Sequence, residues 1–402
     1  MGFAKTQMLE EEERGWATSE KNVCVRCVED SFLKSVVRRS FVAKRCDYCK
    51  SNRRAAPVDH LIEIIYGTLR KYFAEPADAG VPYEGEYLIQ PIDTDEALDL
   101  LGFEADPELF DDVSRAINNE YWVPAAQGHW ATEHQSSLLQ TAWYLFQETV
   151  RHRTRYMFER LVDVDAGASQ DIDPAFMLDE LANAVSARKL IKSVKKNLAI
   201  YRCRLRSEGD DWPLDAVEMG APPYAKAGAG RMNPIGIPYF YGALDATTAA
   251  AEVLSSPPQK LVTSEWRIRK SIYVLDLTAL PPTPSVFDEA AYDARQNILF
   301  LKHFVDEVTH PIAKDGREHI GYIPTQIVCE YFATAFRRDA EQPMLRGILY
   351  PSAVYPGGKN LVVFPDFERE GERFKILEMI EATLQKITSW TDVADLLKRT
   401  EG

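Results

Sequence analysis

Residues suited to chemistry gather in one short segment, GRMNPIGIPYFYGALDATTAAAEV, which spans residues 230–253. Arg231 carries a planar guanidinium group that can bind a pyrophosphate through two parallel hydrogen bonds. Tyr239 and Tyr241 offer ring faces to a flat base, and Glu252 offers a carboxylate to a ribose hydroxyl. This set predicts a site that holds a dinucleotide.

Two elements must bring these side chains together. The run IPYFYGAL is typical of a strand, and DATTAAAEVL is typical of a helix capped by Asp245 or Thr247. The helix would return Glu252 towards the tyrosines of the strand. Prolines follow the nearby GAG sequence at once, which excludes the strand–turn–helix of a Rossmann dinucleotide site.

The segment resembles the core of a RES domain, a family named for an arginine, a glutamate and a serine. The serine has a counterpart in ILYPSAVYPGGKN, which places Ser352 directly after a strand-like run. The resemblance covers about the C-terminal half of the chain, from AIYRCRLR to VVFPD, with every block in order. It implies a small mixed sheet related to ADP-ribosyltransferases and cleavage of NAD, with nicotinamide released or ADP-ribose passed to phosphate or to a protein.

Arginines recur in the strand-like run AIYRCRLR, where alternation places Arg202, Arg204 and Arg206 on one face. By resemblance, Arg202 matches the first arginine of the family, and Arg204 is close enough to share its role. We therefore expect Arg202, Arg204 and Arg231 to hold the pyrophosphate. The alternative is an edge strand that exposes its charges to solvent.

The resemblance assigns the reacting end of NAD to the remaining residues. Tyr241 is expected to stack on the nicotinamide with Tyr239 beside it, and Ser352 to bond the amide or the ribose. Glu252, with Arg231 and Tyr241 in the catalytic group, would stabilise the positive charge that builds on the ribose as the glycosidic bond breaks. The alternatives are an ordinary ion pair for Glu252 and a turn-closing role for Ser352.

Four of the six cysteines form two CxxC pairs, Cys24 with Cys27 and Cys46 with Cys49. This spacing predicts a structural zinc site, because four thiolates complete a tetrahedral shell and leave no position for a catalytic water. A pair of disulfides and a redox CxxC are the alternatives. A zinc-dependent hydrolase is disfavoured on the same ground.

Basic residues surround these cysteines. Between the pairs, EDSFLKSVVRRSFVAKR predicts a short helix with an apolar inner face and an outer face of lysines and arginines. Such a surface could contact nucleic acid or an acidic partner, and it is also what solubility alone would place around a small zinc core. Nucleic acid is not the favoured partner.

The middle of the chain carries apolar residues at three- and four-residue intervals, which predicts four or five helices. RES proteins with long N-terminal extensions often carry a zinc knuckle and a HEPN-like helical domain, and the order here is similar. HEPN ribonucleases use an Arg and a His four to six residues apart, and VRHRTRYMF lacks that spacing. We therefore interpret the helical part as a sensor or scaffold.

These observations predict an α+β protein in four parts. An acidic lead-in and zinc module occupies residues 1–56, and a HEPN-like helical domain occupies residues 57–194. A mixed α/β, ADP-ribosyltransferase-like RES domain occupies residues 195–370, and amphipathic helices occupy residues 371–402.

Composition limits the classes of partner. The 402 residues are 46% hydrophobic, which supports folded domains throughout, and a net charge of -14 opposes broad binding to nucleic acid. No apolar run is long enough to cross a membrane, and the N-terminus lacks the apolar core of a signal peptide, so we expect a cytoplasmic protein without membrane contact.

Two classes of function fit the sequence. The first is an NAD-consuming toxin or defence effector, a glycohydrolase or phosphorolase, with mono-ADP-ribosylation of a protein as the alternative within that class. Its partners would be NAD, an antitoxin or regulatory protein, and in a homo-oligomer a second copy. The second class is a non-enzymatic zinc and helical module that binds RNA or protein, with a nucleotide-sensing domain.

Overall fold

The structure is a computed structural model, and its described part leaves gaps in several segments. It describes residues 3–125, 130, 135–160, 176–207, 209–255, 257–310, 318–336, 344–365, 376–389, 391–392 and 395–396. The chain divides into two compact units, the N-terminal unit (Met1–Leu138 with Thr283–Asn297) and the C-terminal unit (Leu139–Pro282 with Ile298–Gly402). Among the described residues, no helix combines the length and the apolar character needed to cross a membrane.

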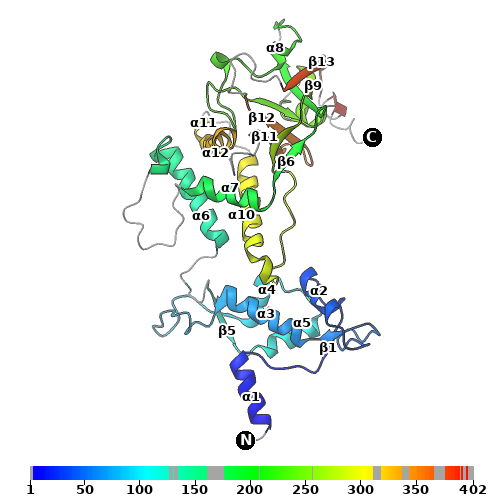
Figure 1. The fold of residues 1–402 in the computed structure, drawn as a ribbon, viewed down its shortest axis with the longest axis vertical. Coiled ribbons are helices and arrows are strands. Elements are labelled where there is room, and N and C mark those ends of the chain that lie inside the picture. Colours follow the sequence, from blue (N-terminus) through cyan, green and yellow to red (C-terminus); the bar gives the residue numbers. More distant parts are fainter. Residues whose placement is uncertain are drawn as a thin grey trace. The chain divides into compact units, whose positions relative to one another are not determined.

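The N-terminal unit consists of helices with two small sheets (Figure 1). Its helices are α1 (Phe3–Arg14), α2 (Ser31–Arg39), α3 (Asp59–Tyr72), α4 (Thr94–Leu101) and α5 (Pro107–Ala116). Its strands are β1 (Asn22–Val23) paired with β2 (Ala56–Pro57), and β3 (Phe73–Ala74), β5 (Tyr121–Pro124) and β4 (Ile92–Asp93) in that spatial order.

Side-chain caps set the starts of three of these helices. Asp30, Asp93 and Asp106 each accept hydrogen bonds from backbone amides of the first turn of α2, α4 and α5, as N-cap residues do. The inner face of α2, with Leu33 and Val37 fully buried, packs into one core with α3, α4 and α5. The short helix expected between the cysteine pairs is therefore confirmed.

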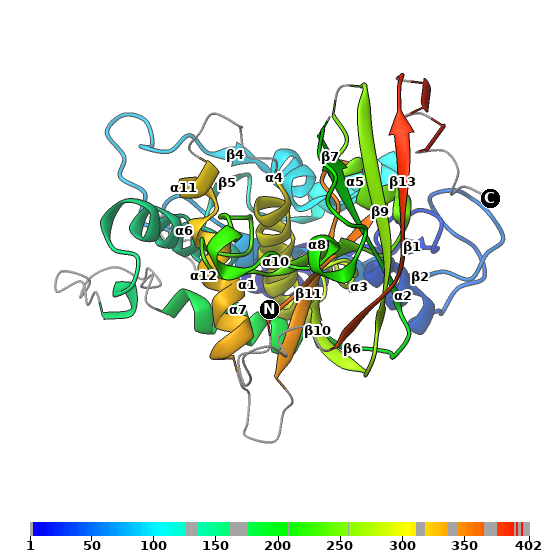
Figure 2. The same ribbon diagram turned by 90° about the horizontal axis from the view of Figure 1, so that it is seen from above.

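The C-terminal unit is built on one eight-stranded sheet. The spatial order is β13 (Leu377–Ile387), β9 (Gln259–Ile268), β7 (Ala199–Arg206), β8 (Phe240–Ala243), β12 (Lys359–Val363), β11 (Leu345–Pro351), β10 (Ile272–Asp276) and β6 (Ile191–Val194). Among the strands that the structure describes, only the pairing of β10 with β11 is parallel, which makes the sheet mixed. Figure 2 shows β7, β9 and β13 side by side at one end of this sheet.

Helices cover one face of the sheet. They are α6 (Gln135–Glu148), α7 (Met177–Ala187), α9 (Ala246–Ala251), α10 (Tyr292–Thr309), α11 (Glu318–Gly321) and α12 (Ile323–Thr334). Trp143, Phe304 and Phe332 from three of the long helices belong to one buried core with Ile348 and Val362 of the strands. One unit boundary falls within α6, a second follows Pro282, and a third falls within α10. The boundary in α6 divides the segment 57–194, which was expected to be one helical domain, between the two units.

Shorter elements complete the C-terminal unit. They are a π-helical turn (Thr149–Arg153), the one-turn helix α8 (Ala216–Met219), and 3-10 turns at Phe158–Arg160 and Tyr224–Lys226. A further 3-10 turn, Glu289–Ala291, lies in the N-terminal unit before α10. The other face of the sheet has its own core, in which Phe240, Trp266 and Met219 are buried.

The expectation of amphipathic helices in residues 371–402 is wrong for the described stretch Leu377–Ile387, which forms strand β13. Leu, Glu, Met, Ala, Gln and Lys favour helices intrinsically, but β13 pairs with β9 in antiparallel register at ten positions. Leu377 and Ile387 at its two ends are buried, and Ile380 is the extra residue of a bulge. Pairing with the sheet thus overrides local propensity.

Candidate functional site

Glu252 lies where α9 ends, directly above strand β7. Asp245 caps the helix, because its carboxylate accepts hydrogen bonds from the backbone amide and the hydroxyl of Thr248, both at 2.7 Å. Ala249 and Ala250 of α9 pack closely against Cys203 of β7. Small side chains on this helix therefore bring the carboxylate of Glu252 close to the sheet.

Two donors fix one oxygen of that carboxylate. Glu252 Oε1 accepts from Ser352 Oγ at 2.8 Å and from Asn360 Nδ2 at 2.5 Å. Ser352 Oγ in turn accepts from the amides of Val354 and Tyr355, so its proton is directed at Glu252. Within the described residues, Oε2 has no hydrogen-bond partner, and this oxygen is therefore available to a ligand.

The hairpin of β11 and β12 supplies both donors. Asn360 pairs in register with Tyr350 across these strands, and Ser352 follows the end of β11. A Cβ on Gly358 would lie 2.5 Å from Thr248 Oγ1, so only glycine lets this turn approach α9 so closely.

A cavity of about 170 Å³ lies beside Glu252. Its lining residues are Tyr201, Arg202, Cys203, Tyr241, Gly242, Ala249, Glu252, Val253, Tyr350 and Asn360. Small-molecule sites usually measure roughly 300–1,000 Å³. The cavity therefore has room for one end of a dinucleotide and leaves the rest outside.

The ring of Tyr241 is held in one orientation at this cavity. Its hydroxyl donates to Asn233 Oδ1 at 2.8 Å and accepts from the amide of Met232 at 3.0 Å. Burial raises the pKa of Tyr241 well above its usual value, and burial also raises the pKa of Tyr350, with the nearby carboxylate of Glu252 acting in the same direction. Both phenols therefore stay neutral and contribute aromatic surface.

The arginines of β7 lie on the face of the strand opposite to Cys203 and α9. The guanidinium group of Arg202 lies 5.2 Å from the ring centre of Phe240 and donates to the carbonyl of Tyr241 at 2.8 Å. Burial lowers its pKa to about 10. Arg204 donates to the carbonyl of Glu218. Of these two, only Arg202 contributes to the cavity wall, and the pyrophosphate-binding role of both stays a prediction.

Arg231 is also bound to the protein. Its Nη1 donates to the carbonyls of Val308 at 2.5 Å and His310 at 2.8 Å, and so it satisfies carbonyls at the C-terminal end of α10. It is absent from the residues that line the cavity. In this arrangement Nη1 serves the fold, and the expected role of Arg231 in pyrophosphate binding stays a prediction.

Tyr239 does not reach the cavity. It is 2% exposed, and its ring lies 5.2 Å from that of Phe364 in the core beneath the helices. Tyr239 and Tyr241 are two residues apart and share a face, but the helices cover the first and the cavity exposes the second. The structure therefore brings together Tyr241, Glu252 and Ser352 of the predicted residues, with Arg202 in the wall, and leaves Tyr239 apart.

Sequence reasoning missed Asn360 and Tyr350. Both come from the segment ILYPSAVYPGGKN that supplied Ser352, on the strands that flank its turn. Alternation from Ser352 back to Tyr350 was a usable signal for the tyrosine. Asn360 had no comparable signal in the sequence, because only the antiparallel pairing of β12 with β11 places its amide beside the other site residues.

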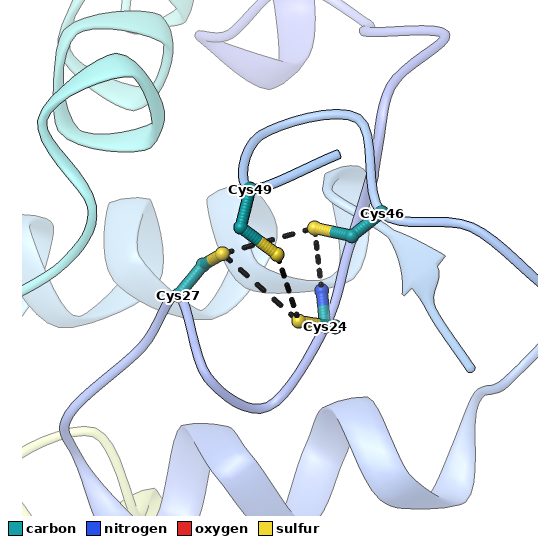
Figure 3. A group of neighbouring side chains, drawn as sticks. All are labelled: Cys24, Cys27, Cys46 and Cys49. Atoms are coloured by element: carbon teal, nitrogen blue, oxygen red, sulfur yellow. Dashed lines mark hydrogen bonds between the residues drawn. The ribbon is translucent and has the colours of Figure 1, made fainter. Parts of the chain in front are cut away.

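A second group of side chains can hold a metal ion. The ligand atoms of Cys24, Cys27, Cys46 and Cys49 all lie within 4.8 Å of one another (Figure 3). Sulfurs bound at about 2.3 Å in a tetrahedron lie roughly 3.8 Å apart, and three of the separations here are 3.6, 3.7 and 4.0 Å. The four residues fit a tetrahedral ion.

The environment of the cysteines supports a bound cation. Cys24 and Cys46 are fully buried, and burial raises the pKa of the Cys27 thiol. Without a cation, the interior would thus oppose the ionised form of such a thiol. The amide of Cys24 donates to the sulfur of Cys46 at 3.3 Å, which is the kind of support that metal-binding thiolates receive.

The fold and the site define an α+β protein with a cysteine cluster near its N-terminus and a carboxylate-centred cavity on a C-terminal mixed sheet. Comparison with protein families matches residues 40–163 to HEPN/RES N-terminal domain 1 and residues 199–385 to the RES domain. The chain is therefore a RES-domain protein with a HEPN-like N-terminal part. At the level of the family this indicates an NAD-related function of the toxin type. No curated protein matches the chain.

Proposed function

We propose that the C-terminal unit cleaves the bond between nicotinamide and ribose in NAD. The observation that carries the proposal is the carboxylate of Glu252, which Ser352 and Asn360 fix through one oxygen at the edge of a cavity lined by tyrosines. The second oxygen faces no protein donor among the described residues. A carboxylate presented in this way can stabilise developing positive charge.

The nicotinamide end of NAD is the part that suits the cavity. Its volume accepts a single ring with part of the ribose, and the neutral ring of Tyr241 offers a rigid stacking surface. The pyrophosphate would then lie outside, where Arg202 and Arg231 are the candidates for its recognition. This placement puts the ribose beside Glu252.

Bond cleavage in this site needs no general acid. The bond between ribose C1′ and the nicotinamide ring nitrogen breaks, and its electron pair goes to the ring nitrogen, so nicotinamide leaves as a neutral molecule. Glu252 stabilises the oxocarbenium-like ribose. An oxygen of water, phosphate or a protein side chain then bonds to C1′ and loses its proton to solvent.

The other assignments extend this proposal. The protein would act in cells as a toxin or defence effector, restrained by an antitoxin or another regulatory protein. The four cysteines would hold zinc as a structural ion, because a full thiolate shell leaves no position for water. The basic side chains around them would contact an acidic partner.

A second candidate function is a nucleotide sensor without turnover, and the hydrogen bonds of two arginines favour it. Arg204 and Arg231 already donate to backbone carbonyls, so a ligand could bind by displacing those contacts and moving the segments that they hold. Such a protein would bind NAD and leave it intact.

Product analysis distinguishes these functions. Purified protein is incubated with NAD in buffer alone, with phosphate and with cell extract, and nicotinamide, ADP-ribose, its phosphorylated form and modified proteins are quantified. Nicotinamide release supports the proposal, and the second product identifies the acceptor. Binding of NAD without any nicotinamide release under all three conditions would establish the sensor instead.

A further inference from the structure

A second and larger cavity lies where strands β7, β9 and β13 end together. Its volume is about 440 Å³. Its lining residues are Leu205, Arg206, Ser207, Pro258, Gln259, Lys260, Lys386, Ile387 and Thr388. The proposed NAD chemistry uses none of these residues.

Three cationic side chains cross this end of the sheet in a single row. Arg206 pairs in register with Lys260, and Lys260 pairs in register with Lys386. Residues in register on antiparallel strands share a face, and neighbouring strands lie about 4.8 Å apart. Like charges placed directly opposite each other destabilise a sheet, so the row calls for a compensating anion.

The protein provides little compensation. Arg206 donates to Asp211 at 3.1 Å and to the carbonyl of Trp212 at 2.6 Å. Within the described residues, neither Lys260 nor Lys386 forms an ion pair. The row thus carries two positive charges more than its acidic partner balances.

Arg206 adds evidence of a constructed site. Its side chain is only 10% exposed, and its buried Nε has no hydrogen-bond partner among the described residues. The neighbouring carboxylate of Asp392 is already engaged, because it accepts from the amide and the hydroxyl of Thr388 and from the amide of Ser389. A ligand would therefore meet two lysines that form no ion pair among the described residues, beside an arginine whose Nε is unpaired.

We propose that this cavity binds a phosphorylated small molecule of nucleotide size, with its phosphates on Lys260, Lys386 and Arg206. The volume lies within the range of small-molecule sites. Leu205, Pro258 and Ile387 supply apolar surface for the organic part of the ligand. The site is separate from the cavity at Glu252, although both contact β7.

Calorimetric titration of the full chain tests this site, with ADP, inorganic phosphate and uncharged adenosine as probes. The Glu252→Gln variant serves as the background, so that any NAD chemistry is absent. We expect saturable binding of ADP that weakens with salt, since phosphate contacts are ionic. The double variant Lys260→Gln/Lys386→Gln should lower the affinity at least tenfold, and Lys270→Gln, an exposed lysine in the turn after β9, should not change it.

Three results would overturn the inference. They are the absence of saturable ADP binding, equal binding of ADP by the double variant in its folded state, and adenosine binding as tight as that of ADP. Inorganic phosphate binding as tightly as ADP, with the same dependence on the lysines, would retain the anion site and reject the organic pocket. Circular dichroism confirms that each variant is folded. Failure here leaves the proposed NAD chemistry unaffected, because that chemistry depends on Glu252.

Discussion

At the scale of single residues, the hydrogen bonds to Glu252 determine how its carboxylate meets a ligand. Two donors hold Oε1, and the carboxylate cannot rotate without losing both. A hydrogen bond to a charged group contributes about 1.5–3 kcal/mol. Asn360, which is 4% exposed, is therefore a positioning residue for the proposed reaction.

The Asn360→Asp variant tests this positioning role. At neutral pH it places a second carboxylate against Glu252, and we expect nicotinamide release to fall about tenfold or more. Two neighbouring carboxylates repel each other, so the pair takes up its first proton at a higher pH than a lone carboxylate does. A proton at lower pH would restore a donor, so activity should recover as the pH falls.

The pH profile of kcat supplies the measurement, and Asn360→Ala supplies the control. The alanine variant cannot regain a donor, so its activity should stay low at every pH. Identical profiles for the two variants would contradict the positioning role.

The hydroxyl of Tyr241 is predicted to stabilise the fold while its ring serves the ligand. Tyr241→Phe removes the partner of Asn233 and of the amide of Met232, and leaving such buried groups unpaired costs about 1–3 kcal/mol. We expect a lower Tm with the aromatic surface retained. Tyr273→Phe, at an exposed tyrosine of β10, should leave the Tm unchanged; an equal loss in both variants would argue against this role.

The sequence was informative about some of these residues and silent about others. Glu252, Tyr241 and Ser352 could be predicted to lie together, because their motifs are local and ordered, although their roles stay predictions. The contacts of Arg204 and Arg231 could not be predicted, since a backbone carbonyl that accepts from a guanidinium group leaves no trace in residue type. Asn360 was missed because strand pairing alone gives it a function.

At the scale of elements, β13 shows where local patterns fail. The run LEMIEATLQKI suits an amphipathic helix, yet it forms the edge strand of the sheet. Alternation predicted the strands β7 and β8, and helical periodicity predicted the helices α10 and α12. These patterns were visible because each of these elements has buried apolar residues in a core. An edge strand with one buried residue at each end carries much weaker alternation.

Substitutions in β13 should reflect its pairing. Ile387→Ala truncates a fully buried side chain, and such changes cost about 2–5 kcal/mol. Leu384→Ala, at a residue that is 42% exposed, should cost much less. Thermal unfolding monitored by circular dichroism makes the comparison. A larger effect at Leu384 than at Ile387 would contradict the observed burial.

The cysteine cluster joins the segment before α2, which carries Cys24 and Cys27, to the segment between α2 and α3, which carries Cys46 and Cys49. Metal loss should therefore weaken the N-terminal unit. We expect about one zinc per chain by elemental analysis, and loss of metal with a lower Tm after Cys24→Ser. The same effect should follow treatment with a chelator. Cys329→Ser, at a buried cysteine outside the cluster, should retain the metal; a metal content that is unchanged by Cys24→Ser would contradict the site.

At the scale of the whole molecule, the net charge and the RES family favour an enzyme that acts on a small molecule over a protein that binds nucleic acid. The chain has a net charge of -14, and local groups of basic residues lie around the cysteines and at the ends of β7, β9 and β13, with other lysines and arginines spread along the chain. The proposed cleavage of NAD would have to be restrained in the cell.

The most direct test compares nicotinamide release from NAD by the wild-type protein and by Glu252→Gln. Glutamine keeps the size of the side chain and an oxygen for Ser352 and Asn360, but it removes the negative charge. We predict release by the wild type, a loss of about a hundredfold or more in Glu252→Gln, and no change in Glu381→Gln, which alters an exposed carboxylate of β13. Equal release by wild type and Glu252→Gln would contradict the central claim that this carboxylate drives the cleavage.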